Sequence, residues 1–182
     1  RLYSMAQRIY TADPILEQVR PTLEELRNTT EETVVLGKLS AEGRVIYIEV
    51  VQSFNPIRYV AVAGMQRSLH ANSIGKALLA RLDANERQKI LQTKQLDAFN
   101  QRTKTHIEEI EQELLQSEQR GWFENIGESI ADVAGIAWPL HLNGTYYAMS
   151  IAGPIYRIQE QREALAERLR TACRLLDDQS LR

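Results

Sequence analysis

The chain has 182 residues, of which 43% are hydrophobic and 25% are charged, a composition typical of one globular domain with a sizeable core. Its formal net charge of −2 and pI of about 6.0 argue against a basic surface that binds nucleic acid by itself. The single cysteine excludes an intrachain disulfide and a cysteine-based zinc site and is typical of the reducing cytoplasm, and we find neither a signal peptide nor an apolar run long enough to span a membrane.

Residues 1–12 carry a narrow apolar stripe that predicts a helix. Because the sequence starts at Arg1, inside this pattern, we interpret it as the C-terminal part of a longer protein, with residues 1–12 as the end of a linking helix. The stripe could seed self-association, or the segment could fray as a short terminal helix. Asp13-Pro14 is typical of a helix start, so we expect the domain to occupy residues 13–182, beginning with a helix whose apolar stripe ends at Leu26.

The next segments are predicted to be strands because they are rich in β-branched residues. Residues 33–39 and 44–51 flank Ser40–Gly43, which is a plausible hairpin loop. Residues 58–63 predict a third strand.

Three helices are expected in the middle of the chain, over residues 73–81, 83–91 and 105–120. Asp83 with Glu86, and Thr105 with Glu108, have the spacing of capping boxes at the second and third of these starts. Gly121 is predicted to end the third helix in the left-handed conformation.

Residues 133–142 and 145–152 flank Asn143-Gly144, the strongest short hairpin signal, and residues 159–176 predict a final amphipathic helix. Helices at both ends with antiparallel hairpins between them predict an α+β fold, in which helices flank one central antiparallel β-sheet.

The register of the last hairpin follows from its two-residue turn. Gly135 should oppose Ala152, and Ala137 should oppose Ser150, so that one face carries four small residues. The opposite face should carry bulky pairs: Ile136 with Ile151, Trp138 with Met149, and Leu140 with Tyr147. The small face is either the floor of a ligand cavity, with Ser150 as a polar anchor, or a surface onto which a helix packs closely.

A second feature is the segment from His70 to Lys76, which leads into a helix. Asn72 or Ser73 is a suitable N-cap, and the unpaired amides and positive dipole of a helix start favour an anion. Gly75 would let a ligand approach the backbone, and an anion would offset the unfavourable position of Lys76 near the helix start. The alternative is a simple capped helix without a ligand.

These residues resemble those of a known family. The run from Leu69 to Ala80, L-H-A-N-S-I-G-K-A-L-L-A, resembles the signature of IclR-type transcription regulators, roughly L-H-A-[ST]-[AG]-x-G-K-A-L-L-A. Further matches follow the family in order and cover essentially the whole chain: Glu31–Val34, Arg120–Trp122 with Glu128, Val133–Pro139 and Ser150–Pro154.

The resemblance implies a GAF-like fold that binds a small metabolite, often an organic acid, and forms homodimers or homotetramers. It also implies a preceding winged helix-turn-helix domain, through which alone the protein would contact DNA. We expect no cofactor, no membrane association and no catalytic activity.

Position by position, the resemblance and the two features above place a ligand site at twelve residues: Tyr59, Arg67, Asn72, Ser73, Ile74, Gly75, Asn125, Glu128, Val133, Gly135, Ser150 and Ala152. Ser73 and Ile74 would offer backbone N–H groups, and Pro56 would lie on the wall with Tyr59. Arg67 would pair with a carboxylate, or be a solvated loop residue.

The chain departs from the family pattern at three of four positions that can be compared. Relatives that sense glyoxylate-like acids tend to have Asp, Cys, Ser and Ser at the positions of Asn125, Gly135, Ser150 and Ala152, and only Ser150 is kept. The pocket should therefore be roomier and less polar, which favours a larger, partly apolar acid such as an aromatic carboxylate.

Two other functions stay open. A small enzyme could use the same cavity, with Glu128 as its acid or base, although the sequence lacks a G-x-S-x-G nucleophile motif. A pure oligomerisation domain would have a filled cavity. None of His70, His106 and His141 has a metal-ligand neighbour in an H-x-x-x-H pattern, and His70 is expected to shape its loop.

Overall fold

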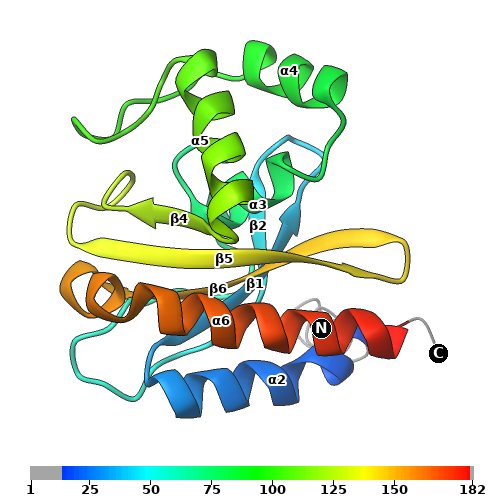
Figure 1. Cartoon of the computed structure of the whole chain (residues 1–182), viewed down its shortest axis with the longest axis vertical. Coiled ribbons are helices and arrows are strands. Elements are labelled where there is room, and N and C mark those ends of the chain that lie inside the picture. Colours follow the sequence, from blue (N-terminus) through cyan, green and yellow to red (C-terminus); the bar gives the residue numbers. More distant parts are fainter. Residues whose placement is uncertain (1–13, 181–182) are drawn as a thin grey trace, which may run out of the picture.

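The computed structural model describes residues 14–180, which form three layers (Figure 1). A six-stranded antiparallel sheet in the order β3-β2-β1-β6-β5-β4 is the central layer. The strands are β1 (Thr33–Leu39), β2 (Val45–Val51), β3 (Gln66–Arg67), β4 (Phe123–Ile126), β5 (Val133–Leu142) and β6 (Thr145–Pro154). The helices are α2 (Pro14–Thr30), α3 (Ser73–Leu79), α4 (Ala84–Thr93), α5 (Ile107–Arg120) and α6 (Ile155–Ser180). The predicted α+β class is confirmed.

Helices α2 and α6 lie side by side on one face of the sheet, and α3, α4 and α5 lie on the other (Figure 1). Each face has its own hydrophobic core, because strands buried on both faces offer alternate side chains to each layer. Among residues 14–180, none of the helices combines the length and apolarity needed to cross a bilayer.

The β5–β6 hairpin has the predicted register. Asn143 and Gly144 have φ angles of 48° and 78°, as a two-residue turn between twisted strands requires. Gly135 pairs with Ala152, and Ala137 pairs with Ser150. The three bulky pairs lie on the face that packs against α2 and α6, whereas the small residues face α3.

The predicted strand at residues 58–63 is wrong. The segment keeps the alternation of a strand, with Tyr59 and Ala61 buried, but it joins the sheet through side chains instead of a backbone ladder. Thr33 Oγ1 donates to the Tyr59 carbonyl at 2.7 Å, and Gln52 Nε2 donates to the Ala61 carbonyl at 3.0 Å. Periodicity alone does not distinguish these two ways of holding an extended segment.

The predicted signals at Asp83 and Gly121 agree with the observed helix ends, as does the cap expected at Asn72 or Ser73. Asp83 Oδ1 accepts from the Glu86 amide at 2.9 Å, and Gly121 ends α5 with φ 91°. The capping box expected at Thr105 is wrong, because the N-cap of α5 is His106, which makes no side-chain capping hydrogen bond.

Strand β4 was not expected, and α6 is longer than the predicted 159–176. A four-residue strand directly after a helix offers too few positions for a period to be recognised. The linking helix expected over residues 1–12, and the cap expected at Asp13, lie outside the described residues.

Candidate functional site

A small cavity lies between the first turn of α3 and the small-residue face of β5 and β6. It has a volume of about 20 Å³, which accommodates roughly one water molecule. Most of the predicted site residues line it: Tyr59, Asn72, Ser73, Ile74, Asn125, Val133, Gly135, Ser150 and Ala152. The sequence therefore identified residues that the fold brings together from five separate segments.

Asn72 fixes the start of α3 at the cavity. Its extended backbone (φ −135°, ψ 136°) lets Oδ1 accept from the amides of Ile74 and Gly75, at 3.0 and 3.3 Å. Its Nδ2 donates to Tyr47 Oη at 3.1 Å. The Ile74 amide is consequently not free for a ligand in this conformation, whereas the Ser73 amide has no acceptor among residues 14–180.

Two serine hydroxyls connect α3 to the sheet. Ser73 Oγ and Ser150 Oγ are hydrogen-bonded at 3.0 Å, and both are buried. A Cβ at Gly135 would lie 2.9 Å from Ser73 Oγ and 3.2 Å from Ser150 Oγ, so the glycine permits this close approach. The helix thus packs closely onto the small face, and the larger chamber expected from the sequence is not seen in this conformation.

The opposite wall contains a pair of tyrosines. The hydroxyls of Tyr47 and Tyr59 lie 3.3 Å apart, and burial, followed by the neighbouring Tyr59, raises the pKa of Tyr47. Arg67 Nε and Nη2 both donate to Tyr59 Oη at 3.3 Å. Arg67 does not line the cavity, but it contacts the cavity residue Tyr59 and interacts electrostatically with Tyr47.

Gly75 and Pro56 lie outside the cavity. Gly75 is needed for packing, since a Cβ there would collide with the backbone of Leu69. This contact explains the glycine without the ligand approach that the sequence suggested. Pro56 is exposed and does not contribute to the lining.

Glu128 lies behind the cavity in a buried ion pair with Lys76. Lys76 Nζ bonds Glu128 Oε1 at 2.5 Å and the Glu124 carbonyl at 2.9 Å, and the Lys76 side chain is 1% exposed. Burial lowers the pKa of Lys76, although the charges of Glu128 and Glu113 oppose that shift. The anion that offsets Lys76 is therefore a residue of this chain, not a bound ligand.

The cavity lining also includes residues that the sequence did not single out: Val35, Tyr47, Ser129, Ile130 and Ala134. Val35 belongs to β1, where it pairs with Ser150 of β6. No local signal predicts that pairing, because the two strands are far apart in the sequence. Ala134 lies between the predicted residues Val133 and Gly135. Strand alternation places it on the opposite face of the sheet, so its contact with the cavity was not predicted.

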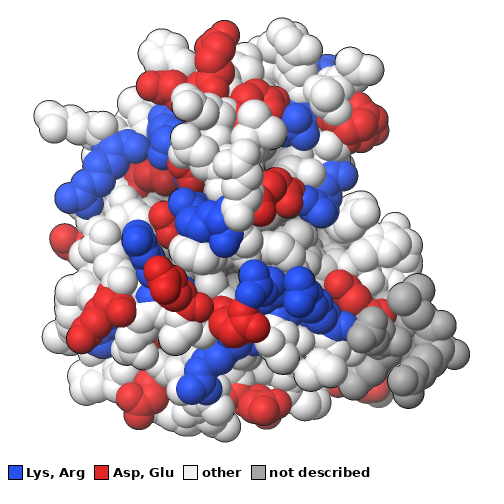
Figure 2. All heavy atoms as spheres, viewed as in Figure 1, with Lys and Arg blue, Asp and Glu red and all other residues white. Residues whose placement is uncertain are grey.

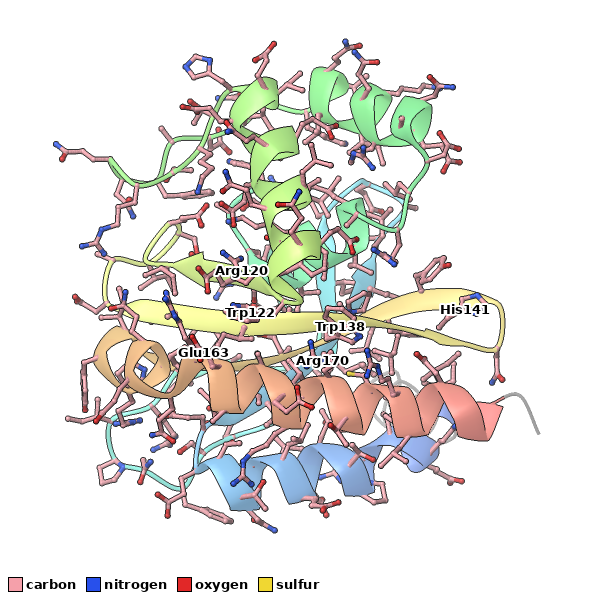
Figure 3. The ribbon with its side chains drawn as sticks, in the orientation of Figure 1. Arg120, Trp122, Trp138, His141, Glu163 and Arg170 are labelled. Atoms are coloured by element: carbon pink, nitrogen blue, oxygen red, sulfur yellow. The ribbon has the colours of Figure 1, made fainter. Side chains whose placement is uncertain are left out.

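The Arg-Gly-Trp segment positions one wall of the cavity. Arg120 and Trp122 lie where α5 meets β4 (Figure 3), and the guanidinium of Arg170 of α6 reaches Gly121 between them. The Arg120 guanidinium lies 5.1 Å from the centre of the Trp122 ring, and its Nη1 lies 3.2 Å from Glu124 Oε1. This cluster anchors β4, which carries Asn125 into the cavity.

The histidines serve structural roles where their contacts are defined. His70 Nε2 lies 3.0 Å from the Asp97 carbonyl, and the His70 ring stacks on Phe99, in agreement with a role in shaping its loop. Burial lowers the pKa of His70. Within residues 14–180, no group of three or more His, Cys, Asp and Glu residues could hold a metal ion.

The surface of the molecule shows mixed charge. On the face in Figure 2, acidic and basic side chains alternate over the same area, in line with the net charge of −2.

The family model "Bacterial transcriptional regulator IclR C-terminal" matches residues 7–178. The chain belongs to this family. The IclR family consists of transcription regulators and is not enzymatic. The interpretation of the chain as an IclR-type regulatory region, made from its motifs, is confirmed.

Curated IclR relatives are similar over most of this chain. The regulator BhcR of Paracoccus denitrificans is 30% identical over 150 residues, which cover 81% of this chain and 53% of BhcR. The regulator KdgR of Escherichia coli is 30% identical over 153 residues, covering 82% of this chain and 58% of KdgR. The chain therefore spans about half the length of the curated relatives that it matches.

Solved structures of IclR proteins share the fold. The C-terminal domain of E. coli KdgR has a TM-score of 0.80 at 27% identity, covering 91% of this chain and 97% of that domain. An IclR homologue from Microbacterium hydrocarbonoxydans, complexed with 4-hydroxybenzoate, has a TM-score of 0.79 at 24% identity, covering 90% of this chain and 66% of the homologue.

Proposed function

We propose that the chain is the ligand-sensing region of an IclR-type transcription regulator, and that the cavity beneath α3 receives a small organic acid. The observation that carries the proposal is the cavity itself, which joins the first turn of α3 to the small-residue face of β5 and β6. Its polar groups converge from different elements: the hydroxyls of Ser73 and Ser150, the amide of Asn125, and the hydroxyl of Tyr59.

The described conformation would be the closed one, because about 20 Å³ cannot hold an organic acid. We expect the connection between β4 and β5 to move on binding. Ser129 and Ile130 of this connection line the cavity, and Ile130 is also 42% exposed, so this wall separates the cavity from solvent. A ligand that fits only the open arrangement would shift the population towards it.

An aromatic or otherwise partly apolar acid suits the lining. Val35, Ile74, Val133 and Ala152 offer apolar contacts, and the lining contains no carboxylate that would repel an anion. The complex of the Microbacterium homologue with 4-hydroxybenzoate supports this class of ligand. The carboxylate would be received by the Ser73 amide and the two serine hydroxyls, which are hydrogen-bond donors.

The regulatory consequence would depend on a DNA-binding region that precedes the chain in the cytoplasmic protein. We infer that a winged helix-turn-helix domain lies there, that residues 1–12 form the end of the linking helix, and that residues 13–182 also associate as homodimers or homotetramers. Ligand binding would then bias one arrangement of the attached DNA-binding domains.

A thermal-shift titration with a panel of aliphatic and aromatic carboxylates tests the proposal. A ligand that binds only the folded state stabilises it by RT ln(1 + [L]/Kd), so the melting temperature rises as the ligand concentration rises above Kd. Ser150→Ala should weaken the response, whereas Thr29→Ala, which removes a hydroxyl group from exposed α2 on the opposite face of the sheet, should not.

Indifference of the well-folded chain to every acid in the panel would contradict the proposal. It would favour the pure oligomerisation domain instead, to which the close packing of Ser73 on Gly135 already gives some support. An unchanged response of Ser150→Ala would remove Ser150 from the site.

A further inference from the structure

A second cavity lies on the other side of the loop that leads into α3. Its volume is about 150 Å³, far more than that of the cavity beneath α3 and enough for a benzene-sized molecule. Its walls come from the β1–β2 turn, the segment before α3, the end of α4 and the segment after α4. In the described conformation, this second cavity has room for a ligand, whereas the cavity beneath α3 does not.

The floor of the second cavity is apolar. Leu69 and Leu91 are 6% and 2% exposed, and Ile90 and Leu96 are half-buried beside them. Burying a hydrocarbon ring here would remove apolar surface of both the ligand and the protein from water. The floor therefore favours a ligand with an apolar body.

The rim of the second cavity is cationic. Arg44 and Lys94 line it, both are exposed, and neither forms an ion pair with an acidic side chain within residues 14–180. Asp97 is the acidic residue of the lining, and its backbone carbonyl is engaged by His70. Glu42, which does not line the cavity, also attracts Lys94 electrostatically, so two carboxylates lie near the two cations; since neither cation is held in an ion pair within the described part of the chain, both stay available to an anion.

We propose that this cavity is a second ligand site, which binds a small carboxylic acid with a ring or hydrocarbon body. The body packs on the leucine floor, and the carboxylate lies between Arg44 and Lys94, where a guanidinium can bind it in two-point geometry. Asp97 directs the carboxylate to that side by repulsion.

The second site touches the loop that forms the first cavity. Leu69 contributes to the floor of the second site, while its backbone contacts Gly75 of α3 so closely that no side chain fits between them. The same loop carries Asn72 and Ser73 into the first cavity. If the proposed function holds, occupancy of one site changes the affinity of the other, and the two effects are equal by linkage.

The site can be tested by titrating the full chain with 4-fluorobenzoate and following backbone amide NMR shifts. We expect shifts at Gly43, Leu69 and Leu96.

The double variant Arg44→Gln/Lys94→Gln should weaken this binding at least tenfold, because charged hydrogen bonds are lost. The double variant Lys89→Gln/Arg174→Gln, which removes the same charge from exposed positions outside the cavity, should bind as the wild type does. Uncharged 4-fluorobenzamide should bind at least tenfold more weakly.

The outcomes separate this site from the first. Shifts at Gly43, Leu69 and Leu96 that persist in Ser150→Ala support the second site, whatever happens at the first. Shifts confined to Gly135 and Ala152 overturn the second site and leave the proposed function standing. Equal loss of binding in both double variants, equal binding of the amide, or no shifts near Leu69 overturns the second site.

Discussion

Lys76 shows how a single buried charge depends on its partner. Its ammonium is almost inaccessible and is held by Glu128 and a backbone carbonyl. Removing one partner of a buried ion pair leaves an uncompensated charge, which typically costs about 3–5 kcal/mol. We therefore expect Lys76→Met to lower the free energy of unfolding by that amount in urea titrations.

The double variant Lys76→Met/Glu128→Gln is the control for that prediction. It removes both charges and should recover part of the lost stability. A loss below about 1 kcal/mol in Lys76→Met would show that the pair is worth no more than an exposed one.

Glu113 links the same cluster to pH. Burial by itself would raise the pKa of Glu113, but the charges of Lys76, Lys104 and Arg120 outweigh it and hold the pKa below the usual 4.5. A carboxyl group whose pKa is lowered on folding contributes stability above its unfolded pKa, and this contribution is lost as the pH falls through the folded pKa.

We accordingly expect the wild type to lose more stability than Glu113→Gln between about pH 6 and pH 3. Urea unfolding of both chains at several pH values in this window measures the difference. Identical slopes would show that Glu113 titrates alike in the folded and unfolded chains.

The sequence could predict single residues where their chemistry is local. Asn72 was recognised as a possible cap and Ser150 as a residue of the small face, since each follows from its neighbours in the chain. The partner of Lys76 was not recognised, because Glu128 lies on a different element and only the fold brings the two together. For the same reason the contact of Arg67 with Tyr59 was not foreseen, since the two residues belong to different segments.

At the scale of elements, the extended segment 58–63 is held by side chains, and one of them is the Thr33 hydroxyl. Thr33 Oγ1 donates to the Tyr59 carbonyl and accepts from the Ser53 amide at 3.1 Å. Thr33→Val keeps the shape and removes both hydrogen bonds, so hydrogen exchange in residues 53–63 should accelerate. Thr145→Val, at an exposed strand position of β6, is the control and should leave that segment unchanged.

Predictions about helices and strands succeeded where the signal lies within a few neighbouring residues. The β5–β6 register follows from two turn residues, and the helix caps at Asp83 and Gly121 follow from side-chain chemistry within a few residues. The order of the strands, with β1 between β2 and β6, depends on contacts between distant segments. Local patterns carry no information on that order, and so the wall contributed by Val35 could not be predicted.

At the scale of the whole molecule, the two hydrophobic cores pack on opposite faces of the same sheet. We therefore expect the molecule to unfold as a unit. Cys173 offers a measure of this, because it is 0% exposed in the core between α6 and the sheet, and burial raises the pKa of its thiol. We expect a disulfide reagent not to label the native chain at a rate above that of global unfolding, and to label the urea-unfolded chain rapidly. Rapid labelling of the native chain would instead show that α6 detaches locally.

The two faces of the β5–β6 hairpin differ in what they allow to vary. Exchanging large side chains on the α6 side would disturb the packing that keeps the domain folded. On the α3 side, however, the residues that pack there are so short that adding or removing a methyl or hydroxyl group changes the shape of the hollow while the hydrogen-bonded ladder stays intact. Under the proposed function, the preference of the domain for one ligand over another would therefore diverge through a few point changes, while the packing on the α6 side stays unchanged.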